Sequence, residues 1–318
     1  MEESSNTAVA RLYRSMYLIR RVEEEIIRLY PTDKIKSPVH LSIGQEAVSA
    51  AVCDHLQHSD VVFGTYRGHA LYLAKGGDVP RMMAELYGKV DGCGRGKAGS
   101  MHLVDPSVGM MGTSAVVATG VSNAVGAALA LKMQRSSAIV VCFFGEGATD
   151  EGAWHESMNF ASLKKLPILF ICENNFFAIY SHVRDRMAGP GLSARSKAYG
   201  IEAELIEDHE PIRLHQRAGA AVAAVRAGGG PRFLECMTYR WRDHVGPSED
   251  RVYKYRPDEE LDAKIEGDNL KLVGDLLPAG IRKSIEAAEE KRVADAIAFA
   301  EASTFPEDQE VHDHVFAG

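Results

Sequence analysis

The residues whose types and spacing best suit chemistry are a carboxylate between two glycines and a pair of asparagines. Glu146, between Gly145 and Gly147, comes just after the apolar run 138–144, and Asn175 comes just after a second apolar run, 168–172. Between the two runs, the segment 149–165 has apolar residues at roughly helical spacing. The region is therefore predicted to be a strand–helix–strand unit whose two strands are parallel and adjacent.

Parallel neighbouring strands would bring Glu146 and Asn175 to the same carboxyl edge of the sheet, where open α/β folds bind ligands. A carboxylate and an amide oxygen suit Mg²⁺, which takes few protein ligands and completes its coordination with phosphate and water. The glycines on either side of Glu146 allow a phosphate to approach the backbone, and a helix start favours its charge. Each half alone is more typical of a turn or a strand end, but the pair at this spacing indicates a metal–diphosphate site.

This span resembles the thiamine diphosphate signature, in which a GDG motif is followed by NN. The surrounding chain is similar to one family, the alpha subunits of the decarboxylating component of 2-oxo acid dehydrogenases of the pyruvate, branched-chain and acetoin types. The likeness runs from about Arg11 to the C-terminus. Four further blocks carry it: HLSIGQEA at 40–47, TYRGH at 65–69, KAGSMH at 97–102 and TYRWRDH at 238–244.

The resemblance implies thiamine diphosphate and Mg²⁺ as cofactors. Metal ligands are expected at Glu146, Asn175 and the backbone carbonyl of Phe177. A Tyr and an Arg of the family bind the diphosphate, and the planar fork of an arginine suits that task. The residues expected to contact the cofactor are Tyr66, Arg67, Ala115, Val117, Glu146, Gly147, Ala148, Asn175, Phe177 and His244.

Two of the twelve histidines align with functional histidines of the family. His40 matches one near the substrate pocket, and His244 matches one on a loop that closes over the reaction centre. Both are expected to be catalytic, because a histidine with a pKa near neutral holds a carboxylate or moves protons. For His69 and His102 a structural role is as plausible as a functional one.

The sequence departs from the family pattern at several positions. Glu146 replaces the usual Asp and is one methylene longer, which changes the geometry offered to a metal that requires regular octahedral coordination. Ala115 stands where relatives often have Gly or Ser. Val245 replaces a regulatory Ser of mitochondrial pyruvate dehydrogenases, and Asp243 replaces a common Gly, which is expected to stiffen its loop.

The glutamate that activates the cofactor in this family comes from a beta subunit, and the chain shows no second cofactor-type domain. An assembly of two alpha and two beta subunits is therefore expected, acting on a 2-oxo acid or acetoin and passing the acyl group to a lipoyl acyltransferase core. The small residues at 120–124 are expected at a subunit interface. Two alternatives stay open, a carboligase subunit in biosynthesis and a non-catalytic scaffold subunit.

Apolar strands that alternate with helices predict an α/β fold, with a mostly parallel sheet covered by helices on both faces. The chain 1–318 is expected to form one cofactor-binding domain with helical extensions at both ends. Helices are expected at 7–30, 44–56, 79–87, 119–133, 211–227 and 279–303, further strands at 61–64 and 232–239, and polar loops at 181–199 and 242–256.

The segment 94–99 matches the dinucleotide fingerprint GxGxxG formally. It neither follows a predicted strand nor opens a helix, so it is rejected as a Rossmann site. The Walker A pattern also fails, because Asp91 and Ala98 occupy positions where that pattern requires Gly and Ser or Thr. A close-packing or interface role is expected for this loop.

Bulk properties narrow the function classes. The net charge of −8 disfavours nonspecific nucleic-acid binding, and no apolar run is long enough to span a bilayer. The five cysteines are scattered without a CxxC pair, which fits a reduced compartment rather than a disulfide framework or zinc site. With no recognisable targeting segment at the start, a cytoplasmic location is expected.

Overall fold

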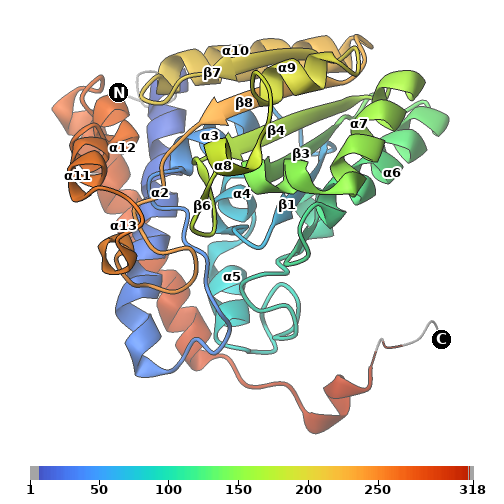
Figure 1. Cartoon of the computed structure of the whole chain (residues 1–318). Coiled ribbons are helices and arrows are strands. Elements are labelled where there is room, and N and C mark those ends of the chain that lie inside the picture. The colour runs from blue at the N-terminus through green and yellow to red at the C-terminus, as the bar shows by residue number, and fades with distance from the viewer. Residues whose placement is uncertain (1–6, 314, 316–318) are drawn as a thin grey trace.

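The core of the protein is a six-stranded parallel sheet with the strand order β2-β1-β3-β4-β8-β7. The computed structural model describes residues 7–313 and 315 (Figure 1). The strands are β1 (Val61–Thr65), β2 (Met110–Ser114), β3 (Val140–Gly145), β4 (Ile168–Asn174), β7 (Glu202–Ile206) and β8 (Arg232–Met237), with a separate antiparallel pair formed by β5 (Phe177–Ala178) and β6 (Ser181–His182).

Helices connect the strands and extend the chain at both ends. The α-helices are α2 (Ala8–Leu29), α3 (Glu46–Cys53), α4 (His69–Ala74), α5 (Val79–Leu86), α6 (Thr119–Met133), α7 (Gly152–Lys164), α8 (Val183–Arg186), α9 (Leu192–Lys197), α10 (Pro211–Arg226), α11 (Asp258–Glu266), α12 (Asn269–Gly274) and α13 (Ala279–Ala302). Among the described residues, none of these helices combines the length and apolar character needed to cross a membrane.

The central strands β3 and β4 are buried on both faces and read as nearly continuous apolar runs. Val141 of β3 and Leu169 of β4 contribute to one hydrophobic core together with α2, α3, α5, α10 and α13. Their neighbours Val140 and Ile168 point to the opposite face and join a second core with α6, α7 and α9. The predicted α/β architecture with helices on both faces is therefore confirmed.

Sequence patterns missed the elements that lack a clear apolar period. The edge strands β2 and β7 were not expected, because β2 contains Gly112 and β7 has only five residues, two of which are glutamates. The prediction of a polar loop over 181–199 was wrong in part, since this segment contains β6, α8 and α9. These short elements depend on tertiary contacts, such as the hydrogen bond from the Ser193 amide to the buried Glu235 carboxylate at 2.9 Å.

The glycine-rich segment 88–99 wraps around a side chain of its own chain. The Glu85 carboxylate accepts four backbone N–H bonds: Gly94 and Gly96 donate to Oε2 at 2.7 and 2.9 Å, while Ala98 and Gly99 donate to Oε1 at 2.7 and 3.0 Å. Successive backbone amides of this kind form an anion-binding concavity. Here the anion is internal, which agrees with the rejection of a nucleotide site.

We predict that Glu85→Gln lowers the free energy of unfolding by roughly 2 kcal/mol or more, because the amide NH₂ would face two backbone donors that lose their acceptor. Urea titration of the variant measures this change. Glu156→Gln, on the exposed side of α7, is the matched control and should stay within about 0.5 kcal/mol of the wild type. Equal stability of the two variants would contradict the role given to Glu85.

Candidate functional site

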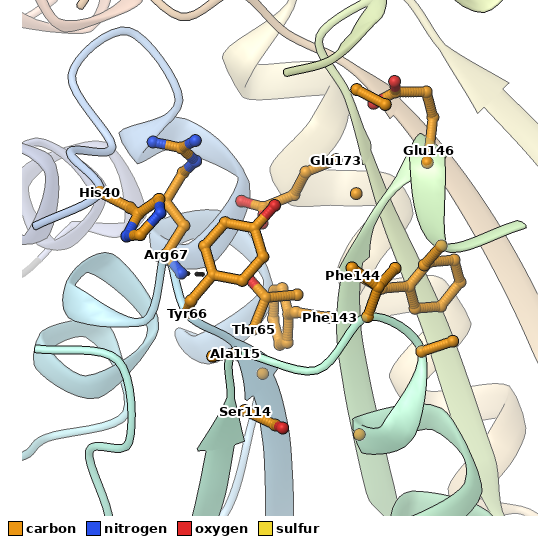
Figure 2. A pocket seen from close by; sticks show the side chains of 18 of the residues that line it. His40, Thr65, Tyr66, Arg67, Ser114, Ala115, Phe143, Phe144, Glu146 and Glu173 are labelled. Carbon is orange, nitrogen blue, oxygen red and sulfur yellow. Dashed lines mark hydrogen bonds between the residues drawn. The ribbon is translucent and has the colours of Figure 1, made fainter. Parts of the chain in front are cut away.

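A cavity of about 470 Å³ lies at the carboxyl edge of the sheet, where β1, β2, β3 and β4 end. Figure 2 shows His40, Tyr66 and Arg67 on one side of it and Glu146 on the other, with Glu173 between them. All ten residues expected to contact the cofactor line this cavity, as does His40. The residues that the sequence singled out therefore lie together around one cavity.

The strand–helix–strand unit brings Glu146 and Asn175 to the same edge. Strands β3 and β4 are parallel and in register, with Gly145 opposite Glu173. Glu146 and Asn175 follow these positions by one and two residues and are both buried. Gly147 is required for a local reason, since a Cβ there would lie 2.8 Å from the Cβ of Ala178.

The Asn175 side chain is oriented by two hydrogen bonds. Its Nδ2 donates to the Gln45 side chain at 2.9 Å, and its Oδ1 accepts from the Phe177 backbone N–H at 3.2 Å. This arrangement fixes the amide oxygen on the side of the β5 hairpin, which carries the Phe177 carbonyl. No cluster of three His, Cys, Asp or Glu side chains suited to a metal occurs in the described part of the chain. The proposed set instead combines a carboxylate, an amide oxygen and a carbonyl, hard oxygen donors that fit Mg²⁺.

Arg67 is a buried cation at the exit of β1. Its guanidinium donates to the backbone carbonyls of Leu41 at 2.6 Å and His244 at 3.2 Å. Burial, together with the charge of Arg240, lowers its pKa to about 10, so it remains charged at neutral pH. Both of these acceptors are neutral, and a guanidinium has five N–H donors, so Arg67 fits the expected role in holding an anion.

Three rings pack beside Arg67. The ring centroid of His40 lies 4.4 Å from Tyr66 and 5.3 Å from His244, and Tyr66 and His244 are 5.6 Å apart. The buried Nδ1 of His40 has no hydrogen-bond partner. An unpartnered polar atom in the wall of a cavity is a feature that a ligand would satisfy.

Both histidines are uncharged at neutral pH. Burial, followed by the charge of Arg67, lowers the pKa of His40 and of His244 to about 3. The expectation of a pKa near neutral was therefore wrong for the free chain, because burial disfavours the charged imidazole and the nearby arginine adds to this effect. In this state each imidazole offers an N–H donor and a lone pair. The positive charge on the side of the cavity formed by His40, Tyr66 and Arg67 therefore comes from Arg67.

The loop that carries His244 is anchored through charged residues beneath it. The Asp243 carboxylate accepts from the Tyr180 hydroxyl at 3.0 Å and the His244 backbone N–H at 2.6 Å. Arg240, fully buried, donates to Asp250 at 3.2 Å and to the Tyr255 hydroxyl at 2.9 Å. These contacts agree with the expected stiffening of the loop by Asp243.

The loop that carries His40 passes close to the segment after β8. Gly44 has φ +93°, and a Cβ there would lie 2.2 Å from the Tyr239 carbonyl oxygen, so only glycine fits. Its backbone N–H donates to Glu46 at 2.9 Å, and Glu46 in turn pairs with the buried Arg20 at 2.5 Å. The HLSIGQEA block therefore positions His40 and Gln45 through its glycine and glutamate.

Sequence reasoning missed two carboxylates of the cavity wall. Glu173 is buried, and burial, partly opposed by Arg67, raises its pKa to about 7. A carboxylate directly after the apolar run 168–172 was a readable signal, since buried charges require a reason. Asp150 also lines the cavity and lies four residues after Glu146, within the turn before α7.

Arg186 of α8 was missed entirely, because it falls in the segment predicted as a loop. Its guanidinium donates to Glu146 at 2.7 Å and also pairs with Asp150. Burial raises the pKa of Glu146, and Arg186 opposes that shift. The proposed metal ligand is therefore held by a cation of the same chain.

His69 and His102, for which the sequence left a structural role open, are not among the residues that line the cavity. His69 is fully buried and joins the Ser100 hydroxyl at 2.7 Å to the Glu23 carboxylate at 3.4 Å, a network between α2, α4 and the residue that follows the glycine-rich segment. His102 contacts the Thr113 carbonyl at 3.3 Å. Their contacts are those of structural residues.

Comparison with solved structures identifies the type of fold. A crystal structure of transketolase from Campylobacter jejuni matches with a TM-score of 0.60 at 17% identity, covering 96% of this chain and 50% of the transketolase chain. The chain thus spans about half the length of that protein. At this identity the match shows a shared fold of the transketolase type.

Sequence comparison then gives the family. The model of the dehydrogenase E1 component matches residues 14–309. The chain is 34% identical over 310 residues to the alpha subunit of acetoin:2,6-dichlorophenolindophenol oxidoreductase from Bacillus subtilis, covering 96% of this chain and 92% of that protein. It is 35% identical over 315 residues to the alpha subunit of the pyruvate dehydrogenase E1 component from Zymomonas mobilis, covering 96% and 88%. The chain belongs to the dehydrogenase E1 component family, as its motifs predicted.

The neutral state of His40 has a consequence for acid stability. An unfolded chain protonates this histidine near pH 6.5, whereas the folded chain does so only near pH 3. The stability that His40 contributes is thus present above pH 6.5 and is lost as the pH falls toward 3. His40→Gln should reduce the slope of the unfolding free energy against pH in this window, by up to about 1.4 kcal/mol per pH unit. Urea titrations at several pH values test this, and an unchanged slope would contradict it.

Proposed function

We propose that this chain is the alpha subunit of a thiamine diphosphate-dependent enzyme that decarboxylates a 2-oxo acid, or cleaves acetoin, and transfers the acyl group to a lipoyl acceptor. The single observation that carries the proposal is the convergence of Glu146, Asn175, Tyr66, Arg67 and His244 on one cavity at the carboxyl edge of the sheet. Membership of the dehydrogenase E1 family supports it.

The residues of the chain would divide the cofactor between two walls. Glu146, Asn175 and the Phe177 carbonyl would hold Mg²⁺, and Tyr66 and Arg67 would bind the diphosphate from the opposite wall. Gly147 and Ala148 would approach the diphosphate at the turn after β3, and the backbone of Ala115 and Val117 would approach the aminopyrimidine. When bound, thiamine diphosphate supplies the nucleophilic carbon and the electron sink that decarboxylation requires.

His40 and His244 would act on substrate and acyl group from the wall that contains Arg67. As neutral imidazoles, they can donate a hydrogen bond to a substrate oxygen and keep a lone pair for a proton. Arg67 contributes to the low pKa of both rings. An anion bound to Arg67 would offset this contribution and raise both pKa values toward the range useful for proton transfer.

Exposed apolar side chains at the rim of the cavity also support the proposal of a partner subunit. Apolar side chains at its rim are exposed, with 65% of Val116, 45% of Val117 and 52% of Ile179 accessible, a pattern typical of surfaces that a partner covers. On α6, Ser122 and Asn123 are exposed within the small-residue segment. We propose that the chain forms one cofactor-binding domain with helical extensions, and that a beta subunit completes its active site in an assembly of two alpha and two beta subunits, located in the cytoplasm.

We predict that the isolated chain is inactive and binds thiamine diphosphate weakly, because part of the pocket belongs to the beta subunit. Co-expression with that subunit should raise the cofactor affinity and produce activity together, since a shared ligand stabilises the assembly. Calorimetry measures the cofactor affinity, light scattering measures the assembly, and a decarboxylation assay with an artificial electron acceptor measures the activity. Robust turnover by the chain alone would refute the two-subunit proposal.

A screen of 2-oxo acids and acetoin on the assembled enzyme separates the proposed function from its alternatives. Reduction of the acceptor, and acyl transfer to a lipoyl domain, would support the dehydrogenase. Carbon–carbon bond formation with an added aldehyde and no acceptor reduction would identify a carboligase. Cofactor binding without either reaction would identify a scaffold subunit.

We predict that Glu146→Ala abolishes Mg²⁺-dependent cofactor binding by the assembled enzyme, because it removes the only carboxylate in the proposed ligand set. Glu146→Asp should preserve or tighten binding, since it restores the length found in the GDG signature. Calorimetric titration at fixed Mg²⁺ measures both. Wild-type affinity in Glu146→Ala would exclude this residue as a metal ligand.

A further inference from the structure

We propose that Arg186 competes with the metal ion for the Glu146 carboxylate, so that a cation of the chain itself sets the Mg²⁺ concentration needed for cofactor binding. This inference rests on the proposed function, because it takes Glu146 as a metal ligand. It assigns a role to a residue outside the sequence motifs of the site.

Arg186 is held in place on three sides. Its Nη2 donates to Glu146 Oε1 at 2.7 Å, its Nη1 pairs with the Asp150 carboxylate, and its Nε donates to the Ser181 carbonyl at 3.2 Å. Only 16% of its side chain is exposed. A guanidinium bound in three directions is a fixed part of the site, unlike a surface arginine that contacts a carboxylate in passing.

The Glu146 side chain needs a positive partner at this position. It is 2% exposed, and a buried carboxylate is stable only when it is paired. Arg186 satisfies this need with one positive charge, and Mg²⁺ would satisfy it with two. A divalent ion placed on Glu146 would lie close to the guanidinium, and the two cations would repel each other strongly in a site of low polarity.

Arg186 is also linked to the third proposed ligand through its own segment. Helix α8 follows the β5–β6 hairpin, which carries Phe177, and the Val183 backbone N–H donates to the Phe176 carbonyl at 2.7 Å. The hairpin packs at Ala178 against the turn that carries Glu146, since a Cβ on Gly147 would lie 2.8 Å from the Cβ of Ala178. A ligand that draws Glu146 or the Phe177 carbonyl inward therefore acts on the segment that positions Arg186.

The glutamate in place of aspartate agrees with this competition. The additional methylene extends the carboxylate from the turn after β3 toward Arg186, and Asp150 binds the other Nη of the same guanidinium. The two carboxylates carry two negative charges against one positive charge. The remaining negative charge would attract Mg²⁺. Binding of the ion to Glu146 would then displace Arg186 from this carboxylate.

The test compares how cofactor binding depends on the Mg²⁺ concentration in the wild type and in Arg186 variants of the assembled alpha–beta enzyme. Thiamine diphosphate binding is followed by calorimetry over a series of Mg²⁺ concentrations. Arg186→Met, which removes the charge and keeps the bulk, should lower the half-saturating Mg²⁺ concentration by roughly tenfold, the scale of one lost charged hydrogen bond. Arg184→Met, in the same helix and 76% exposed, is the matched control and should leave that concentration unchanged.

Arg186→Lys keeps the charge without the guanidinium fork and should give a half-saturating concentration between those of Arg186→Met and the wild type. Equal or higher Mg²⁺ demand in Arg186→Met would overturn the competition. Weaker thiamine diphosphate binding by Arg186→Met at saturating Mg²⁺ would also overturn it, by showing that Arg186 binds the diphosphate. Binding that needs no Mg²⁺ in the wild type would overturn both this inference and the metal site of the proposed function.

Discussion

The in-register parallel pairing of β3 and β4 is the constraint on which the site depends. Both strands end at the same level, with Gly145 opposite Glu173, so the residues that follow them leave the sheet side by side. A shift of one residue in this register would exchange the side chains that pack in the two hydrophobic cores. The two hydrophobic cores thus fix the register, and the register fixes the distance between Glu146 and Asn175.

Buried charge is the second organising element of the cavity. Arg67 is buried on one side of the cavity with Arg240 nearby, Glu146 is buried on the other side, and Glu173 is buried between them. Burial, followed by the charge of Arg67, lowers the pKa of His40 and of His244, and Arg67 opposes the rise that burial causes in the pKa of Glu173. The protonation states of the wall are therefore coupled, and a bound anion or cation would change several of them together.

The sequence predicted the parts of the molecule that have a period or a motif. The apolar runs of β3 and β4 and the helical spacing of α2, α6 and α10 identified the architecture, and the Glu146 and Asn175 motifs located the cavity. Edge strand β7 was not predicted because it is short and two of its five residues are glutamates. Arg186 was not predicted because its position depends on a hairpin and a four-residue helix, which no local pattern specifies.

The glycine-rich segment around Glu85 also determines how the C-terminal part of the chain is attached. Arg95 and Lys97 of this segment pair with Glu310 at 2.6 and 3.2 Å, and the Val90 backbone N–H donates to the Thr304 carbonyl at 2.9 Å. Glycines lose the most conformational entropy on folding, so this segment is ordered by polar bonds instead of apolar burial. Because the same polar bonds hold the glycine-rich segment and residues 303–313, we expect the two segments to gain or lose their order together.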